Sequence, residues 1–256
     1  MAWEITVERD VAVVRMRSNA VNKMNPAFFD DLQRAFDRLD AEHPDRPAVL
    51  TGDGKTFSAG LDFDVTFPVF QRGSLDEIRA WFANFRSAIQ RAFYFPRPLV
   101  AAVNGHALAG GLILALCADF RFAAAGEFRC GLNEVPVGIP MPSVYTEIVR
   151  LKVGTAAATE SILTGAVYSQ ADGLRLGFYD QLVAPEVLLD TAIDRARVIP
   201  PDCLAAYVHS KKMLLWPTMR HLETDALALD ETTIAVVSSP ALVAARTAAL
   251  SRLKAR

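Results

Sequence analysis

The 256-residue chain has few cysteines, and their arrangement indicates neither a disulfide framework nor a zinc site. The three cysteines are Cys117, Cys130 and Cys203, an odd number with no Cys-x-x-Cys pair. This excludes the class of small disulfide-rich secreted domains. The N-terminus also lacks a basic segment followed by an apolar one, so we expect a cytoplasmic protein without a secretory signal.

The sequence also lacks an excess of charge and a long uninterrupted apolar run. Lys and Arg total 27 against 29 Asp and Glu, a formal net charge of −2, so no attraction for nucleic acid is expected. The longest apolar stretch, residues 98–117, is interrupted by three glycines, an asparagine and a histidine. No membrane insertion is therefore predicted. Hydrophobic residues make up 52% of the chain, as in a globular protein.

Strand-like and helix-like patterns alternate over the first 200 residues. Residues 3–16 alternate as a hairpin that turns at Asp10, and short apolar runs typical of buried strands occupy residues 47–51, 98–103 and 119–123. Asn25-Pro26 predicts the start of one helix. Ser74 and Glu77, a capping-box pair, predict another within residues 64–95. Further helical patterns occupy residues 112–117, 153–163 and 169–176.

Pro200-Pro201 interrupts this alternation, and the chain beyond it is mostly helical in pattern. Strands alternating with helices are typical of an α/β fold. We therefore predict an α/β core over residues 1–200, followed by a helical segment over residues 201–256.

Two glycine-containing stretches are candidates for backbone-donor sites. In residues 56–62, small residues after a strand allow N–H groups to face a ligand, although alone such a loop is usually only a turn. In residues 104–111, the pair Gly110-Gly111 precedes an apolar helix. Helix N-termini bind anions, or oxygens that become anionic during a reaction. Close packing of helix and strand explains the same glycines equally well.

A third stretch, residues 128–138, contains Glu134 among apolar and small residues. Such a carboxyl is either a hydrogen-bonded structural group or a base with a raised pKa. On spacing alone, the structural role is favoured. His106, which directly follows a glycine turn, is interpreted as a structural rather than a catalytic histidine.

Together and in this order, the three stretches resemble the crotonase superfamily, also called the enoyl-CoA hydratase/isomerase family. The resemblance extends over nearly the whole chain, and the segments that carry it include residues 19–24, 57–62, 104–119 and 176–183. The resemblance implies a spiral of ββα units with a helical C-terminal segment that builds a homotrimer, or a dimer of trimers, and covers the acyl pocket. It implies an acyl thioester of coenzyme A as substrate, and no metal or redox cofactor.

The resemblance also implies roles for particular residues. The N–H groups of Leu61 and Gly110 would form an oxyanion hole. Further candidates for substrate contact are Ser58, Ala59, Gly60 and Asp62 in the coenzyme A loop, Ala109, and Asn133. Asn133 is equally well explained as a turn-forming residue. Lys211 or Lys212 would bind coenzyme A phosphates; a solvated helix face explains these lysines equally well.

The acid/base groups distinguish the activities within this family. Hydratases carry two glutamates, and in this chain the resemblance places Ile113 at the first position and Glu134 at the second. One carboxylate suffices to move a proton from C2 of a 3-enoyl-CoA to C4. Residues 109–114 and 130–134 also resemble mitochondrial-type Δ3,Δ2-enoyl-CoA isomerases. We therefore predict an isomerase with Glu134 as its single acid/base. The aromatic stretch 63–70, taken as a short loop, departs from those enzymes and leaves the acyl chain open.

Three other functions remain as alternatives. The chain is a hydratase if Asp64 or Glu77 supplies a second acid/base group. It is a thioester hydrolase if it releases free thiol. It is a non-catalytic coenzyme A-binding scaffold if Glu134 has no chemical role, although a carboxylate beside the acyl group argues against this.

Overall fold

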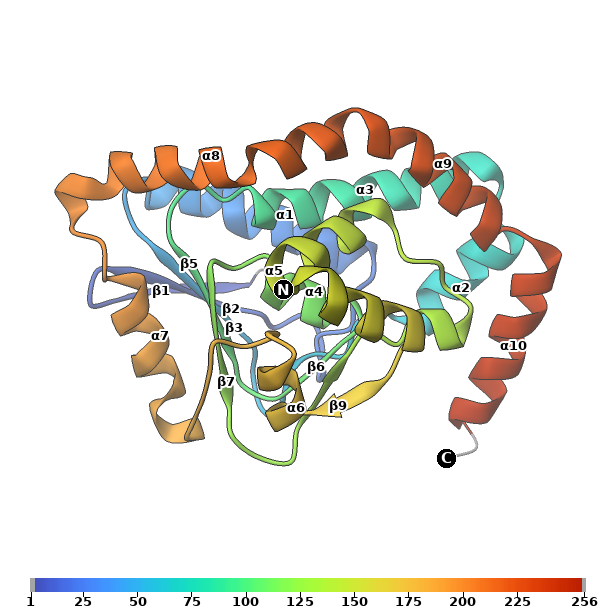
Figure 1. The fold of residues 1–256 in the computed structure, drawn as a ribbon, viewed down its shortest axis with the longest axis horizontal. Helices are drawn as coiled ribbons and strands as arrows, with labels where there is room; N and C mark the ends of the chain where they lie inside the picture. Colours follow the sequence, from blue (N-terminus) through green and yellow to red (C-terminus); the bar gives the residue numbers. More distant parts are fainter. Residues whose placement is uncertain (1–2, 255–256) are drawn as a thin grey trace.

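In the computed structural model, which describes residues 3–254, two sheets are enclosed by helices (Figure 1). The larger sheet has the strand order β1 (Glu4–Glu8), β2 (Val11–Arg15), β3 (Ala48–Thr51), β5 (Leu99–Val103), β7 (Phe120–Ala124) and β10 (Gln181–Val183). The smaller sheet has the order β4 (Thr56–Ser58), β6 (His106–Leu108), β8 (Arg129–Gly131) and β9 (Val167–Ser169). Neighbouring strands are parallel except in the β1–β2 and β8–β9 pairs.

Helices follow most of the strands. They are α1 (Pro26–Glu42), α2 (Phe63–Arg72), α3 (Leu75–Phe93), α4 (Gly110–Leu116), α5 (Ser143–Thr164), α6 (Gln170–Arg175), α7 (Leu188–Ala196), α8 (Leu204–Glu223), α9 (Asp225–Val237) and α10 (Pro240–Lys254). Single 3-10 turns lie at η1 (Val135–Val137), η2 (Pro185–Val187) and η3 (Pro201–Cys203).

Local sequence signals explain several of these boundaries. Asn25 accepts a hydrogen bond from the Phe28 N–H and so caps α1, and Ser74 and Glu77 form the predicted capping box of α3. The hairpin turns at Arg9 and Asp10, which both have positive φ. These predictions from the sequence are confirmed.

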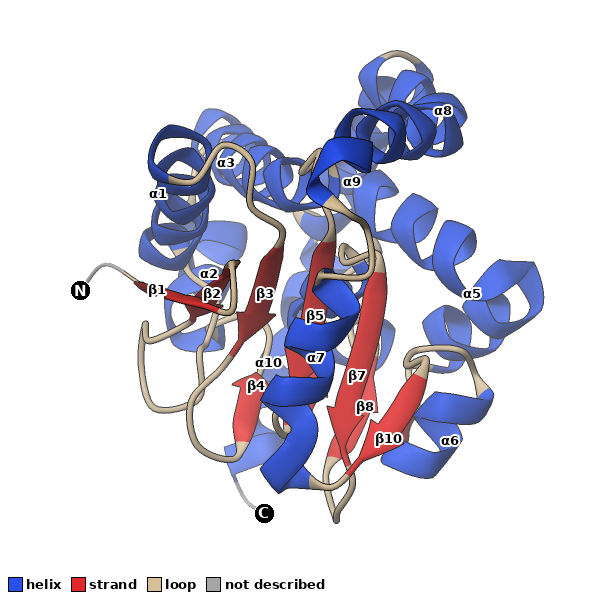
Figure 2. Cartoon of the chain, turned by 90° about the vertical axis from the view of Figure 1, so that its left-hand side faces the viewer, coloured by secondary structure: helices blue, strands red, loops and turns tan. Residues whose placement is uncertain are grey.

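The four central strands of the larger sheet, β2, β3, β5 and β7, are buried on both faces, which explains their largely apolar sequences. Because side chains alternate along a strand, Val13 and Val49 pack with α7 in a small cluster, whereas Val14 and Leu50 belong to the main core. Figure 2 shows α7 in front of the sheet, with α1 and α3 at the upper left, above the strands. The strands therefore form a rigid support for the loops at their ends.

The structure corrects the prediction for residues 63–70, which form helix α2 rather than a loop. The aromatic residues Phe63, Phe67 and Phe70 follow at helical spacing, and two of them are buried. The segment 64–95 therefore contains parts of two helices instead of one. Helix α5 begins at Ser143 and has a non-helical break at Gly154, close to the predicted start at residue 153. Helix α7 was not predicted.

The C-terminal helices extend over the core. Helix α8 lies across the top of the molecule in Figure 1, and α9 and α10 descend beside α3 and α2. The boundary near residue 200 stays a prediction, and residues 255–256 lie outside the described residues. Within residues 3–254 no single helix is long and apolar enough to cross a membrane. Two consecutive segments, Asp225–Val237 and Pro240–Ala249, reach that length and apolar composition only when taken together, and they are bent by 67° relative to each other.

Candidate active site

Two loops of the smaller sheet meet next to its parallel strands β4 and β6. A side chain added at Gly60 would lie 2.7 Å from the Ala109 Cβ, 2.8 Å from the Leu108 carbonyl oxygen and 3.4 Å from the Gly110 nitrogen. Gly60 also has a φ of 78°, in the left-handed region that favours glycine. The absence of a side chain at Gly60 therefore allows the loop before Leu61 to touch the loop before Gly110.

The two N–H groups predicted to form an oxyanion hole have no acceptor within residues 3–254. Neither Leu61 nor Gly110 donates a backbone hydrogen bond there, whereas Asp62 donates to the Met24 carbonyl and Ala109 to the Gly131 carbonyl. Gly110 is the first residue of α4, so its N–H lies at the positive end of a helix dipole. Both donors are available to a ligand oxygen.

Side chains of the preceding loop hold this arrangement. The buried Ser58 hydroxyl donates to the Asn22 carbonyl over 2.8 Å and accepts from the Gly60 N–H over 3.2 Å. Ser58 thus faces inward, and its side chain folds the loop. Ala59 and Asp62 are half-buried, and one Asp62 carboxylate oxygen lies 3.8 Å from the Lys23 ammonium.

Glu134 lies between β8 and η1 and is only 2% exposed. Neither of its carboxylate oxygens has a hydrogen-bond partner in residues 3–254. Burial disfavours the charged form and raises the pKa of Glu134 to about 8. At neutral pH the carboxyl is mostly protonated, and its ionised form is a strong base for a carboxylate.

Glu134 and Leu61 line the same small cavity, of about 10 Å³. The remaining lining residues are apolar or aromatic: Phe70, Trp81, Phe82, Phe85, Ile139, Pro142 and Tyr145. Glu134 is the only carboxyl among these lining residues. Ile113 is fully buried one turn after Gly110 in α4. The cavity therefore brings together Leu61, which is predicted to supply an oxyanion donor, and a single carboxyl group.

Sequence reasoning missed Tyr145, which lies beside this machinery. A side chain added at Gly110 would collide with the Tyr145 hydroxyl, which has no hydrogen-bond partner in the described part of the chain. Burial and the nearby Glu134 raise its pKa well above the ordinary value. A tyrosine within an apolar helical pattern is typical of a core residue, so the sequence carried no signal for this position.

The structure corrects the prediction for Lys211. Its ammonium group is buried and donates to an Asp119 carboxylate oxygen over 2.7 Å and to the Arg97 carbonyl over 3.2 Å. It ties α8 to the core and does not face a coenzyme A phosphate. Lys212 is exposed, since consecutive helical residues point in different directions, and its role stays a prediction.

Other candidates have structural positions. The His106 Nδ1 accepts a hydrogen bond from the Arg129 N–H over 3.0 Å. Glu77 is held by Ser74 at the start of α3 and does not line the Glu134 cavity. Half-buried Asn133 makes no hydrogen bond to Glu134. Residues 3–254 contain no cluster of three or more His, Cys, Asp or Glu side chains that would hold a metal ion.

Comparison with known proteins identifies the class to which this fold and site belong. Residues 6–239 match the family model described as enoyl-CoA hydratase/isomerase, and the chain belongs to this family. It is an acyl-CoA enzyme of that family, which confirms the resemblance found in the sequence.

The relatives that are similar to the chain include both hydratases and isomerases. Crotonyl-CoA hydratase from Syntrophomonas wolfei is 34% identical over 195 residues, 74% of this chain and 73% of the relative. Mouse mitochondrial enoyl-CoA delta isomerase 1 is 29% identical over 205 residues, 79% of this chain and 68% of the relative. The structure of human mitochondrial delta3-delta2-enoyl-CoA isomerase superposes with a TM-score of 0.88 at 25% identity, covering 99% of this chain and 98% of that one. The predicted α/β crotonase fold is confirmed.

Proposed function

We propose that the chain is a Δ3,Δ2-enoyl-CoA isomerase that uses Glu134 as its single acid/base. The observation that carries this proposal is the cavity that Glu134 lines. It is lined by one carboxyl group, which has no hydrogen-bond partner in residues 3–254, and by Leu61, and its other lining residues offer no second carboxyl group. Of the two glutamate positions of the hydratases, the family resemblance places the buried Ile113 at the first.

The reaction follows from these groups. The thioester oxygen of a 3-enoyl-CoA accepts hydrogen bonds from the Leu61 and Gly110 N–H groups. The ionised Glu134 removes a proton from C2, and the negative charge that develops on the oxygen is stabilised by the two donors. Glu134 then returns the proton to C4, which gives the 2-enoyl-CoA. This sequence of steps requires no metal or redox cofactor.

The apolar surroundings suit an isomerase better than a hydratase. Addition of water requires a positioned water molecule and a group that manages its second proton. Ile113 supplies neither, and an apolar cavity excludes water from the reacting carbons.

A paired assay tests the proposal. Purified protein receives trans-3-hexenoyl-CoA in one sample and trans-2-hexenoyl-CoA in the other, and the products are identified by chromatography and mass. We expect conversion of the 3-enoyl ester at unchanged mass and little addition of water to the 2-enoyl ester. Rapid gain of one water by the 2-enoyl ester would show a hydratase, and release of free coenzyme A would show a hydrolase.

A further inference from the structure

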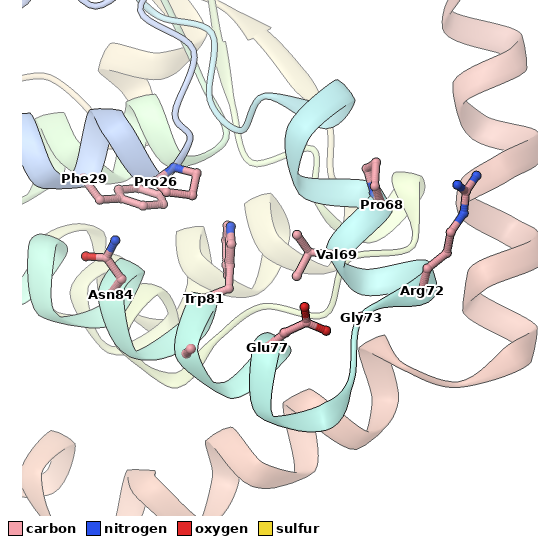
Figure 3. A pocket seen from close by; sticks show the side chains of 10 residues that line it. Pro26, Phe29, Pro68, Val69, Arg72, Gly73, Glu77, Trp81 and Asn84 are labelled. Atoms are coloured by element: carbon pink, nitrogen blue, oxygen red, sulfur yellow. The ribbon is translucent and has the colours of Figure 1, made fainter.

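A second, larger cavity lies next to the Glu134 cavity. It is a groove of about 610 Å³ between α1, α2 and α3 (Figure 3). Trp81 is the only residue that lines both the groove and the Glu134 cavity. In Figure 3 its side chain stands in the centre of the groove, between Phe29 and Val69. Trp81 therefore forms the wall between the two spaces.

Aromatic contacts hold Trp81 in this position from both sides. Its ring packs edge-on against Phe29, which lines the groove, with ring centroids 5.8 Å apart. It stacks on Phe85, which lines the Glu134 cavity, with centroids 5.4 Å apart and planes inclined by 12°. The Trp81 side chain makes no indole N–H hydrogen bond to the described residues, so packing alone holds it. A substitution there leaves no polar partner unsatisfied.

The volume on the Glu134 side is very small. A cavity must offer about 10–15 Å³ to hold one water molecule, and this one measures about 10 Å³. In the proposed function the thioester oxygen binds at Leu61 and C2 lies at Glu134, so the acyl chain would extend among the apolar and aromatic residues that line the same cavity. Each further methylene must displace a packed ring, and displacement of well-packed side chains is costly.

We propose that Trp81 limits this enzyme to short acyl-CoA substrates by closing the acyl cavity off from the groove behind it. The inference rests on the proposed function only in taking an acyl-CoA as the ligand. Chains of four to six carbons displace the fewest ring atoms, because the displacement grows with each methylene. Longer chains meet the Trp81 ring, although space for them exists on its other side.

Equilibrium binding of unreactive saturated esters tests this inference separately from catalysis. Butyryl-, hexanoyl-, octanoyl- and decanoyl-CoA are titrated by calorimetry into the unmodified protein, with free coenzyme A as the reference. We expect butyryl-CoA to bind at least tenfold more tightly than decanoyl-CoA. In Trp81→Ala the discrimination against long acyl chains should disappear. Each additional methylene of the ester that becomes buried should then increase the affinity by about fourfold. Trp81→Leu, which retains more of the packing, changes the preference in the same direction.

Phe82→Leu is the matched control. Phe82 lines the Glu134 cavity but not the groove, so its truncation enlarges the acyl cavity without opening it. We expect tighter hexanoyl-CoA binding and continued discrimination against decanoyl-CoA.

The outcomes separate the two proposals. Equal affinity of the unmodified protein for all four esters overturns the role of Trp81 and leaves the acyl-CoA function intact. So does a Phe82→Leu protein that accepts decanoyl-CoA as well as Trp81→Ala does. If no ester binds more tightly than free coenzyme A, the acyl-CoA function itself is overturned, and this inference with it.

Discussion

At the scale of single residues, the isolation of Glu134 has the largest chemical consequence. The carboxyl is buried and unpartnered among the described residues, and it lines a cavity with Leu61 and with apolar or aromatic residues. A carboxyl kept mostly protonated by its surroundings is poised to exchange a proton near neutral pH. Two predictions follow from this one side chain.

The first concerns turnover. Glu134→Gln keeps the shape of the side chain and removes its basicity, so isomerisation of trans-3-hexenoyl-CoA should fall by about 10²–10⁴-fold. Binding of hexanoyl-CoA should change little, because the oxygen donors are backbone groups. Steady-state kinetics and calorimetry measure the two effects, and Glu186→Gln, an exposed carboxyl on η2, is the control. A Glu134→Gln protein that keeps most of its turnover contradicts a single-base mechanism.

The second concerns stability against pH. Burial raises the pKa of Glu134 from an ordinary 4.5 to about 8. Between these values the unfolded chain has lost the proton and the folded chain keeps it, so rising pH favours unfolding. The free energy of unfolding should fall relative to that of Glu134→Gln by up to about 1.4 kcal/mol per pH unit in this window. Urea unfolding at pH 5, 6, 7 and 8 measures the difference; a difference independent of pH contradicts the raised pKa.

At the scale of elements, the site depends on how closely the loops after β4 and β6 approach. Gly60→Ala places a methyl group against Ala109 and the Leu108 carbonyl and separates the two oxyanion donors. Loss of one such donor costs about 10²–10³ in rate, and we expect a decrease of similar size in turnover. Gly54→Ala is the control, because Gly54 has a φ of 62° but no atom within 4 Å of the added carbon. Equal effects of the two variants on turnover would show that backbone strain, not loop contact, is responsible.

The same scale shows what the sequence was able to predict. The first residues of α1 and α3 were predictable because Asn25, Pro26, Ser74 and Glu77 act on their own backbone neighbours. Strands of three residues are too short to show the alternation of a strand. Helix α2 was interpreted as a loop because its aromatic residues differ from the family pattern at that position. A motif thus located Glu134, while the position of Tyr145 depended on how α5 packs against α4.

Ion pairing was equally hidden from the sequence. Lys211 and Asp119 are 92 residues apart, and only the docking of α8 brings them together. A lysine on a helix has the same local signature whether it faces solvent or a buried carboxylate. The predicted contact of Lys211 with phosphate was wrong for this reason.

At the scale of the whole molecule, the C-terminal helices expose large apolar side chains. Met213, Leu214 and Trp216 on α8 and Leu227 and Leu229 on α9 are each 45–69% exposed. The two helices contact each other, and exposed apolar residues gathered in one region are typical of association surfaces. We expect a homotrimer or a dimer of trimers, as the family resemblance implies, with a solution mass three or six times the 28.0 kDa of the chain.

Light scattering coupled to size exclusion measures this mass. Leu214→Glu together with Trp216→Ser should shift the protein toward the mass of one chain, whereas Leu163→Glu, on an exposed apolar position of α5, should not. A monomeric unmodified protein contradicts the expected assembly.

The close approach of Gly60 and Ala109 also makes the residue types allowed at these two positions depend on each other, although they are far apart in the sequence. Ala109 holds a backbone conformation with φ of 50° that L-residues rarely adopt, and its methyl group fills the space that a side chain at Gly60 would need. The space between the two residues therefore holds one methyl group, either at position 60 or at position 109. We expect the two positions to covary among relatives, and Ala109→Gly to restore part of the turnover that Gly60→Ala loses, since the Leu108 carbonyl remains in the way.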